Sequence, residues 1–327
     1  MEKILVLFPG ALGDFICFLP ALGFLARDRS VDLFARAEYA DLLPPAIHLS
    51  SIERSEVSRL FVAGAGRDNA LRRFFDPYAS IYSWTGNGDR NFAANFELLA
   101  GDRARLFPFR PVHSVVHISH YYLRCVEGKP ARETYPIVPL RREALFWGRN
   151  WLRERGFEGK RILALAPGSG AIEKNWPGEF FREIEKWWQG EGGESLVIFG
   201  PAEEEWFKPH DWRGATVARN LELAKLAALL SQCELYLGND SGLTHLAAAV
   251  GADTVALFGP TDPREWAPLG RRVSVVSQYV ECSPCLRPVM KSCPHRKCLT
   301  TLTPKTVIGF LQNFARADVK LPVRHAP

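Results

Sequence analysis

Stretches with the make-up of strands alternate with stretches of helical spacing along this chain, and the alternation begins a second time after residue 160. The first series contains the apolar runs 3–8 and 31–36, separated by residues 14–27, whose spacing indicates a helix bent or restarted at Pro20. The second series comprises the expected strands that open 161–170 and span 195–200, 234–238, 253–259 and 272–277, with expected helices near 177–189 and 221–232. Strands that alternate with helices form parallel sheets covered by helices. The restart therefore predicts an α/β protein with two sheets, one in each of two domains.

Composition and charge limit the class of protein, its partners and its location. The 327 residues are 47% hydrophobic and 24% charged, which fits two globular domains. A net charge of +5 is too small to indicate nucleic acid, but it suits a phosphorylated substrate or the anionic face of a membrane. The run 3–8 soon meets Pro, Gly and Asp, so it indicates a first strand rather than a signal peptide, and no apolar run is long enough to span a bilayer. We expect a cytoplasmic protein with no nucleic-acid partner, and contact with the cytoplasmic face of the inner membrane stays open.

The domain boundaries follow from the second start of the pattern. We expect a first domain at residues 1–150 and a second at residues 151–303, because an amphipathic helix at 143–156 separates the two series. Residues 304–317 have the spacing of a last amphipathic helix. We expect this closing segment, 304–327, to pack back on the first domain.

The first candidate for chemistry is Asp14, in the stretch "LFPGALGDFICFLPAL". A strand there breaks into a glycine-containing loop and delivers the aspartate at the start of a helix. An aspartate in this place is a common helix cap. It also stands on the ligand side of a parallel sheet, where a carboxylate can remove a proton from a hydroxyl as a general base. Both interpretations stay open at this point.

The second candidate is the stretch "LALAPGSGAIEKNWPGEFF", in which a strand ends in Pro-Gly-Ser-Gly. Gly168 and Gly170 let backbone N–H groups approach an anion, Ser169 offers a hydroxyl, and Lys174 offers a compact positive charge suited to phosphate. The spacing is not that of the P-loop, so it does not predict nucleoside triphosphate hydrolysis. A plain glycine-rich turn is the alternative.

The third candidate is the strand-to-helix turn "GNDSGLTHLAAAVG". Ser241 and Gly242 are expected to supply N–H groups at the helix start, where an anion such as phosphate binds well. Asp240 is an acid in this same place, so it either caps the helix or reaches a ligand that also carries a phosphate. His245, one turn further on, is either a structural residue or a donor to phosphate. Thr261, in "FGPTDP", ends another strand and marks a second turn suited to phosphate.

Four of the seven cysteines crowd into residues 282–298, "CSPCLRPVMKSCPHRKC". Thiolates at such spacings hold a structural Zn or Fe ion by tetrahedral ligation, and His295 is a spare candidate ligand. A proline-stiffened loop of reduced thiols is the alternative. The four candidate ligands are Cys282, Cys285, Cys293 and Cys298.

Three motifs together resemble one family. The stretches "GALGDFICFLPAL", "PGSGAIEKNWPGEFF" and "GNDSGLTHLAAAVGADTVALFGPTDPREWAP" are similar, in order, to the bacterial ADP-heptose:lipopolysaccharide heptosyltransferases, glycosyltransferase family 9. The resemblance is specific in the C-terminal half and only general between residues 37 and 110. It implies a GT-B architecture, in which two Rossmann-like domains face each other across a cleft. The acceptor then binds the N-terminal domain and the nucleotide-sugar the C-terminal one.

The resemblance also implies roles. Asp14 matches the general base and Lys174 the basic residue at the donor phosphate. Ser169 and Gly170 match the phosphate loop. The donor-site turns are matched by Asp240, Ser241, Gly242, His245 and Thr261. In the resulting hypothesis Asp240 caps the turn and reaches a donor hydroxyl while the helix N–H groups hold the diphosphate.

The implied activity is inverting transfer of heptose from ADP-heptose to a saccharide or glycolipid acceptor of lipopolysaccharide, without a catalytic metal or other cofactor. The base and sugar of the donor and the identity of the acceptor stay open. Arg103, Arg105 and Arg110 are candidates to meet an acidic acceptor, with a solvated basic face as the alternative. Two rival functions share the expected fold and turns: a nucleotide-sugar epimerase or hydrolase, and a non-catalytic nucleotide-sugar-binding protein.

Overall fold

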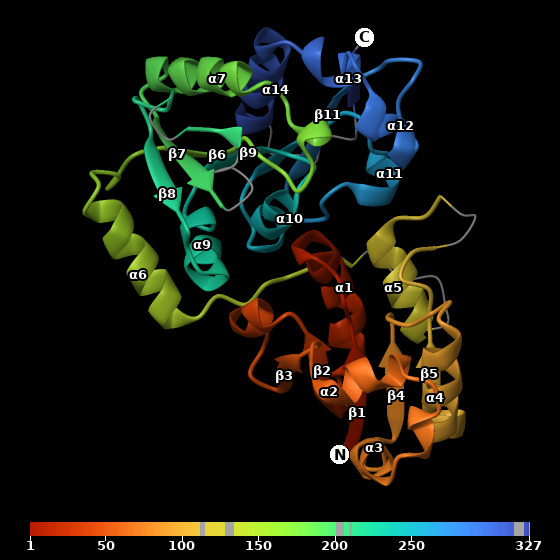
Figure 1. Ribbon diagram of the computed structural model, residues 1–327. Helices are drawn as coiled ribbons and strands as arrows, with labels where there is room; N and C mark the ends of the chain where they lie inside the picture. The colour runs from red at the N-terminus through yellow and green to blue at the C-terminus, as the bar shows by residue number, and fades with distance from the viewer. Residues whose placement is uncertain (112–114, 128–133, 201–205, 209–210, 317–323, 327) are drawn as a thin grey trace. The chain divides into compact units, whose positions relative to one another are not determined.

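The computed structural model of the chain describes residues 1–111, 115–127, 134–200, 206–208, 211–316 and 324–326. Contacts between Cα atoms divide the chain into two compact units, Met1–Thr134 and Tyr135–Pro327 (Figure 1). We expected the division at residue 150, but helix α6 (Arg142–Arg153) packs against helix α9 (Leu223–Leu230) of the second unit. The close approach at Gly148 explains this, because a Cβ there would lie 2.7 Å from the side chain of Gln232.

The first unit is built on a five-stranded sheet with the order β3-β2-β1-β4-β5. Its strands are β1 (Glu2–Leu7), β2 (Arg29–Ala35), β3 (Ile47–Ser51), β4 (Ser80–Ser83) and β5 (Ala104–Leu106). Every neighbouring pair is parallel, so all five strands end at the same edge of the sheet.

The helices of this unit pack on both faces of its sheet. They are α1 (Leu12–Leu25), α2 (Ser55–Ser58), α3 (Asn69–Phe75), α4 (Arg90–Ala100) and α5 (Ile118–Glu127), with short 3₁₀ turns η1 (Ala37–Leu42), η2 (Arg59–Phe61), η3 (Ala65–Arg67) and η4 (Gly101–Arg103). Helix α1 continues through Pro20 and packs beside α5. Buried aromatic rings join α1 to the sheet, with Phe8 stacked on Phe18 at 4.2 Å between ring centroids.

The second unit is built on a seven-stranded sheet with the order β12-β11-β10-β9-β6-β7-β8. Its strands are β6 (Ile162–Ala166), β7 (Glu194–Phe199), β8 (Thr216–Arg219), β9 (Leu235–Asn239), β10 (Thr254–Phe258), β11 (Val273–Gln278) and β12 (Arg324–Ala326). All neighbouring pairs are again parallel. The sheet grows from β6 in both directions, so a topological switch point lies between β6 and β9. Ligands of open parallel sheets bind outside the strand ends at such a point.

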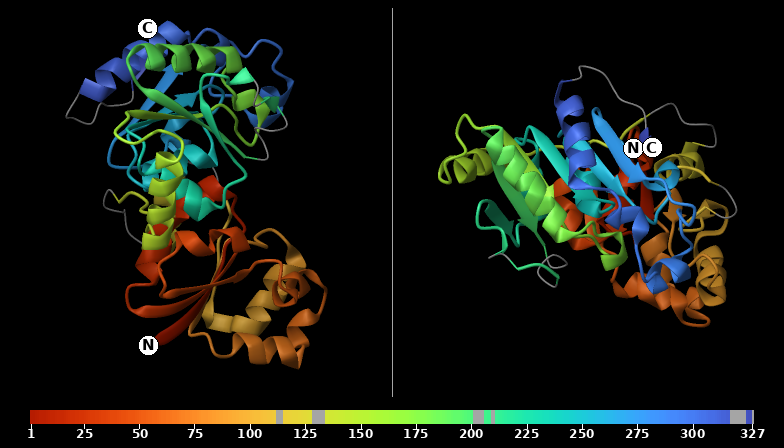
Figure 2. Two further views of the ribbon diagram at one scale, coloured as in Figure 1. Left: turned by 90° about the vertical axis from the view of Figure 1, so that its left-hand side faces the viewer. Right: turned by 90° about the horizontal axis from the view of Figure 1, so that it is seen from above.

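Helices cover both faces of the second sheet, with α7 and α14 on one side and α9 and α10 on the other (Figures 1 and 2). Besides α6 and α9, the helical elements are α7 (Gly178–Gly190), α10 (Gly242–Ala249), α11 (Pro263–Trp266), α12 (Arg287–Ser292), α13 (Lys297–Thr300), α14 (Pro304–Arg316) and the 3₁₀ turn η5 (Ile172–Lys174).

The structure corrects the expected position of the closing helix. We expected residues 304–327 to pack on the first domain, yet Val307, Leu311 and Phe314 of α14 belong to the hydrophobic core of the second. The physical reason is the apolar face of α7, which offers Phe181, Ile184 and other side chains to the same core. Residues 317–323 and 327 of that segment lie outside the described residues.

These folds confirm the prediction of an α/β protein with two parallel sheets. Within the described residues, no helix is both long and apolar enough to cross a membrane.

Candidate functional site

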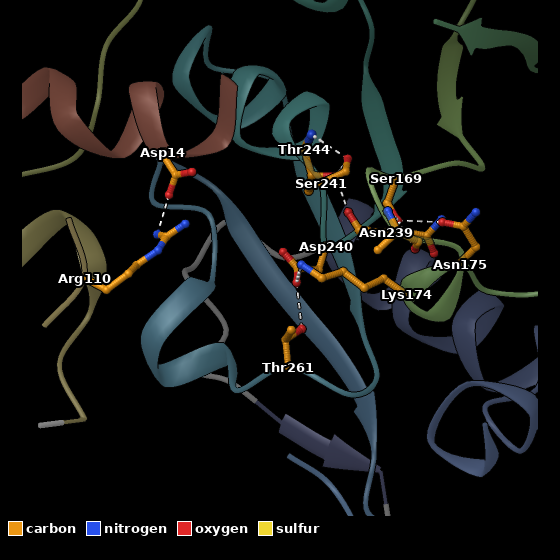
Figure 3. Close-up of polar contacts among 11 residues, drawn as sticks. Asp14, Arg110, Ser169, Lys174, Asn175, Asn239, Asp240, Ser241, Thr244 and Thr261 are labelled. Atoms are coloured by element: carbon orange, nitrogen blue, oxygen red, sulfur yellow. Dashed lines mark hydrogen bonds and ion pairs between the residues drawn. The ribbon is translucent and has the colours of Figure 1, made fainter. Parts of the chain in front are cut away.

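Two carboxylates stand beyond the carboxyl ends of strands, one in each unit, and each is paired with a cation (Figure 3). Asp14 follows β1 of the first sheet. Asp240 follows β9 of the second. Both are residues that the sequence singled out, and both lie where parallel sheets place their ligands.

Asp14 lies in the first turn of α1, but it does not cap that helix. The N-cap residue is Ala11, and no side chain caps this end. Asp14 Oδ1 instead accepts a hydrogen bond from the guanidinium of Arg110, which follows β5 (Figure 3). Asp14 Oδ2 makes no hydrogen bond with any described residue and keeps some contact with solvent. Arg110 thus holds one oxygen of this carboxylate, and the other oxygen is left for a ligand.

The turn before Asp14 requires a glycine. A Cβ at Gly10 would lie 2.4 Å from the ring of Phe8 and 2.7 Å from Cβ of Asp14. The hydroxyl of Tyr39 donates to the carbonyl of Gly10 at 3.1 Å. These contacts hold the loop against the core and so fix the position of Asp14, which follows the loop.

Two tyrosines near Asp14 remain protonated at any physiological pH. Burial raises the pKa of the Tyr39 phenol well above its ordinary value, against the opposing charge of Arg36. Burial and the nearby charge of Asp14 do the same for Tyr122. Neither phenol is therefore suited to accept a proton.

Asp240 forms a tighter polar cluster. Its Oδ2 accepts a hydrogen bond from Lys174 Nζ at 2.7 Å and another from Thr261 Oγ1 at 2.7 Å (Figure 3). The side chain of Asp240 is only 7% exposed, and that of Lys174 is 25% exposed. Asp240 Oδ1 makes no hydrogen bond within the described residues and is not fully buried. The structure thus brings together Lys174, Asp240 and Thr261, three residues predicted separately from three strand ends.

Asp240 is not a helix cap, so that part of the expectation is wrong. The N-cap of α10 is Ser241, whose Oγ accepts a hydrogen bond from the N–H of Thr244. The carboxylate of Asp240 instead forms an ion pair with Lys174. The N–H groups of Gly242 and Leu243 make no hydrogen bond in the described part of the chain. They leave the start of α10 able to hold an anion.

The glycine-rich loop after β6 folds around Ser169. Its Oγ lies 2.7 Å from the carbonyl of Ala171 and 2.7 Å from Oδ1 of Asn175. Ser169 is buried, so its hydroxyl shapes the loop in this structure rather than pointing outward. Gly170 differs, because a Cβ built there meets no atom within 4 Å. The space beside Gly170 is therefore open.

Asn239 supports the candidate site, and the sequence had not singled it out. Its Oδ1 accepts a hydrogen bond from the N–H of Trp176 at 2.9 Å, and its Nδ2 donates to the carbonyl of Pro167 at 2.7 Å. It is fully buried. One side chain on β9 thus holds both ends of the loop that carries Lys174. Its position in the sequence could have identified it, because Asn239 stands directly before Asp240 at the end of an expected strand.

His245 is buried inside α10 among the alanines of that helix. Arg103, another residue singled out from the sequence, donates hydrogen bonds to the carbonyls of Phe75 and Tyr78 and so fastens a turn of the first unit. Arg105 bonds to the carbonyl of Asp102.

The four clustered cysteines are all unbridged. Cys298 is buried in the core of the second unit, whereas Cys282 is exposed. Among the described residues, no three His, Cys, Asp or Glu side chains are grouped so as to hold a metal ion. Burial, followed by neighbouring thiols, raises the pKa of Cys298 to about 11.

Solved structures share this fold across nearly the whole chain. A glycosyltransferase of family 9 from Veillonella parvula is similar with a TM-score of 0.76 at 19% identity, over 96% of this chain and 97% of that one. The ADP-heptose lipopolysaccharide heptosyltransferase II of Escherichia coli is similar with a TM-score of 0.69 at 18% identity, over 96% and 98%. At these identities the likeness concerns the fold alone. That fold, two Rossmann-like α/β domains, is the GT-B architecture of glycosyltransferases.

Sequence comparison identifies the family to which the chain belongs. The model of glycosyltransferase family 9 (heptosyltransferase) matches residues 126–295, just over half of the chain. The chain belongs to this family. Lipooligosaccharide heptosyltransferase 2 of Campylobacter jejuni is 29% identical over 171 residues, 48% of this chain and 52% of that protein. The chain thus spans about half the length of the curated relatives that it matches, at 52% and 50% of two of them. The matched family region contains Ser169, Lys174, Asp240 and Thr261, and Asp14 lies outside it.

Proposed function

We propose that this protein is an inverting glycosyltransferase that moves heptose from ADP-heptose to a saccharide acceptor of lipopolysaccharide or a related cell-envelope glycan. The observation that carries the proposal is the cluster of Lys174, Asp240 and Thr261 at the switch point of the second sheet. The membership of family 9 supports the reaction class. The name of the similar Escherichia coli structure supports ADP-heptose as the donor.

On the donor side, the diphosphate lies at the start of α10 and beside Gly170. The amides of Gly242 and Leu243 and the charge of Lys174 face the phosphate oxygens, while Asp240 Oδ1 accepts a hydrogen bond from a donor hydroxyl. Negative charge grows on the leaving diphosphate as the glycosidic bond breaks. Lys174 and the two amides already point to the place where this charge develops. They therefore stabilise the transition state more than the ground state.

On the acceptor side, Asp14 acts as the general base. Its free Oδ2 takes the proton of an acceptor hydroxyl while that oxygen forms a bond to the anomeric carbon. The bond from this carbon to the diphosphate breaks on the opposite face, and ADP leaves with the electron pair. Attack opposite the leaving group inverts the anomeric configuration. The step needs no oxidant or reductant, and we propose that it needs no metal ion.

Arg110 positions the base. Its guanidinium fixes Oδ1 of Asp14, so Oδ2 is the oxygen presented to the acceptor. Arg110 is itself 39% exposed and stacks its cationic group over the ring of Phe109 at 4.6 Å. Its exposed guanidinium suits an anionic group of the acceptor, such as a carboxylate or phosphate.

The test is an assay of transfer with purified protein, ADP-heptose and delipidated core oligosaccharide. The proposal expects a heptosylated product of inverted anomeric configuration by NMR, formed equally well after treatment with EDTA. Donor consumed without acceptor would support an epimerase or hydrolase instead. Donor bound with no turnover, even with cell-envelope extract as acceptor, would support a non-catalytic binding protein.

A variant sharpens the donor assignment. Asp240→Asn keeps the size of the side chain but removes the charge that pairs with Lys174. We expect it to weaken donor binding more than it lowers the melting temperature. The reverse result would give Asp240 a purely structural role.

A further inference from the structure

Helix α6 presents an unusual face to solvent. The helix packs on α9 through Gly148 and Leu152, which are buried. Arg142, Phe146, Arg149 and Arg153 recur at intervals of four, three and four residues, which places them on one stripe of an α-helix. All four are exposed, and at 100° per residue the stripe lies on one flank of the helix, roughly 110° around from the buried Gly148 and Leu152. Figure 1 shows α6 at the left of the second unit, with α9 on its inner side.

The charge of this stripe is not compensated. Arg142, Arg149 and Arg153 have no ion-pair partner among the residues that the structure describes. Other arginines of the chain do have an acidic partner. Arg161, for example, forms an ion pair with Glu234 at 2.8 Å. The stripe is therefore a row of positive charges without acidic partners of its own.

An apolar side chain stands in the middle of these charges. Phe146 is 63% exposed and contacts no aromatic ring among the described residues. Trp147 and Trp151 lie on the other flank of the helix, under Lys225 and Arg155, and are not part of the stripe. An exposed aromatic ring among arginines is typical of helices that lie in the interface of an anionic bilayer.

We propose that the stripe Arg142–Phe146–Arg149–Arg153 docks this protein on an anionic lipid surface. The three guanidinium groups contact lipid phosphates, and the ring of Phe146 enters the boundary between headgroups and acyl chains. The exposed phenylalanine is what favours a lipid over an acidic protein or a nucleic acid, because a purely electrostatic partner leaves that ring in water. The inference is independent of the transfer reaction, since neither sugar substrate takes part in it.

The experiment is co-flotation of the full-length protein with vesicles in the absence of any sugar substrate. Vesicles of phosphatidylcholine alone are compared with vesicles that contain phosphatidylglycerol and cardiolipin. The wild type is expected to bind the anionic vesicles and to lose them as salt is raised from 0.05 to 0.5 M, by screening. The triple variant Arg142→Gln/Arg149→Gln/Arg153→Gln is expected to bind on the order of a hundredfold more weakly. Phe146→Ser is expected to weaken binding by roughly tenfold. This loss is expected to depend less on the salt concentration than the loss caused by the triple arginine variant.

A matched control removes the same charge elsewhere. Arg67, Arg72 and Arg73 are exposed on the first unit, and their triple change to Gln is expected to leave vesicle binding within about twofold of wild type. Equal weakening by both triple variants would overturn the assignment to α6, because net charge alone would then explain binding. Wild-type protein that ignores anionic vesicles would overturn it as well.

Two further readouts separate this proposal from its rivals. Melting temperatures of all variants, measured alongside, show whether α6 still packs on α9. If the α6 variant changes the elution volume of the protein but not its vesicle binding, the stripe is a protein contact and the proposal is wrong. Transfer to a delipidated acceptor is expected to be unchanged in the α6 variant, so failure of docking and failure of the proposed reaction give different results.

Discussion

The two carboxylate–cation pairs differ in how firmly they are held. Asp240 is 7% exposed and accepts bonds from both Lys174 and Thr261 on one oxygen. Asp14 is 12% exposed, and its partner Arg110 is 39% exposed. The pair in the second unit thus joins a buried carboxylate to a half-buried lysine, whereas the arginine of the pair in the first unit is exposed.

This difference suits two different tasks. A buried, doubly bonded pair holds its geometry and is expensive to break, which is what a binding site for a charged donor needs. A carboxylate with an exposed partner exchanges its contacts at lower cost when an acceptor arrives. We therefore expect changes at Asp14 to act on turnover and changes at Lys174 to act on donor affinity and stability.

The largest effect is expected from Asp14→Asn. Loss of the general base lowers kcat by about a hundredfold or more, while the melting temperature changes little because the pair with Arg110 is partly exposed. Initial rates at saturating donor measure this. Asp32→Asn is the control, since Asp32 of the same unit also pairs with a cation, Lys3, at 2.8 Å. An Asp14→Asn protein as active as Asp32→Asn would remove Asp14 from the mechanism.

Lys174→Met is expected to weaken donor binding by roughly tenfold to a hundredfold. It also leaves Asp240 without its cation, at a cost of about 1–2 kcal/mol in the free energy of unfolding, below the 3–5 kcal/mol of a fully buried pair. Chemical denaturation checks the second part.

The chain offers a close control for Lys174. Asp32 Oδ2 also accepts from a lysine and a hydroxyl, Lys3 at 2.8 Å and Tyr78 at 2.7 Å, but it is not at the strand ends. Lys3→Met is expected to leave donor affinity unchanged and to cost less than about 1 kcal/mol, as exposed pairs do. Equal losses from both lysine variants would mean that Lys174 has only a structural role.

Gly170→Val tests the open space beside the loop. A side chain fits there in the free protein, so the melting temperature is expected to stay within about 2 °C of wild type. The same side chain occupies the place assigned to the diphosphate, and donor affinity is expected to fall by roughly tenfold. Gly190→Val, at another glycine with open space, is the control. Unchanged donor affinity in Gly170→Val would move the phosphate site away from this loop.

The smallest effect is expected far from both pairs, at Glu185 of α7. Burial raises the pKa of this carboxyl, against the opposing charges of Lys186 and Arg182. A raised pKa in the folded state gives a stability contribution that is complete below the unfolded pKa and is lost as pH rises through the folded one. Glu185→Gln is therefore expected to match wild type at pH 4 and to melt slightly higher at pH 8. A melting difference that does not change with pH would contradict this.

Much of the fold was predictable because the apolar runs are long and their spacing is regular. The expected strands at 195–200, 253–259 and 272–277 correspond to β7, β10 and β11. Short edge strands were not foreseen, as with β5 (Ala104–Leu106) and β8 (Thr216–Arg219). Three or four residues carry too little pattern, and their pairing depends on the neighbouring strand rather than on their own sequence.

The candidate site was predictable at the level of strand ends but not of contacts. Residues that follow parallel strands meet at one edge, so Lys174, Asp240 and Thr261 were each identifiable from their place after a strand. The pairing of Asp14 with Arg110 was not, because 96 residues separate them and nothing in their spacing connects them. The role of Asn239 was hidden for a similar reason, since it acts on backbone atoms of a different strand end.

The most direct test of the division of labour is a calorimetric titration of ADP into the wild type, Asp14→Asn and Lys174→Met. The account predicts that Asp14→Asn binds ADP with the wild-type dissociation constant, whereas Lys174→Met binds it at least tenfold more weakly, a loss of about 1.4 kcal/mol. Equal losses of ADP affinity in both variants would contradict the assignment of the two pairs to separate tasks. Undiminished affinity in Lys174→Met would contradict the donor site itself.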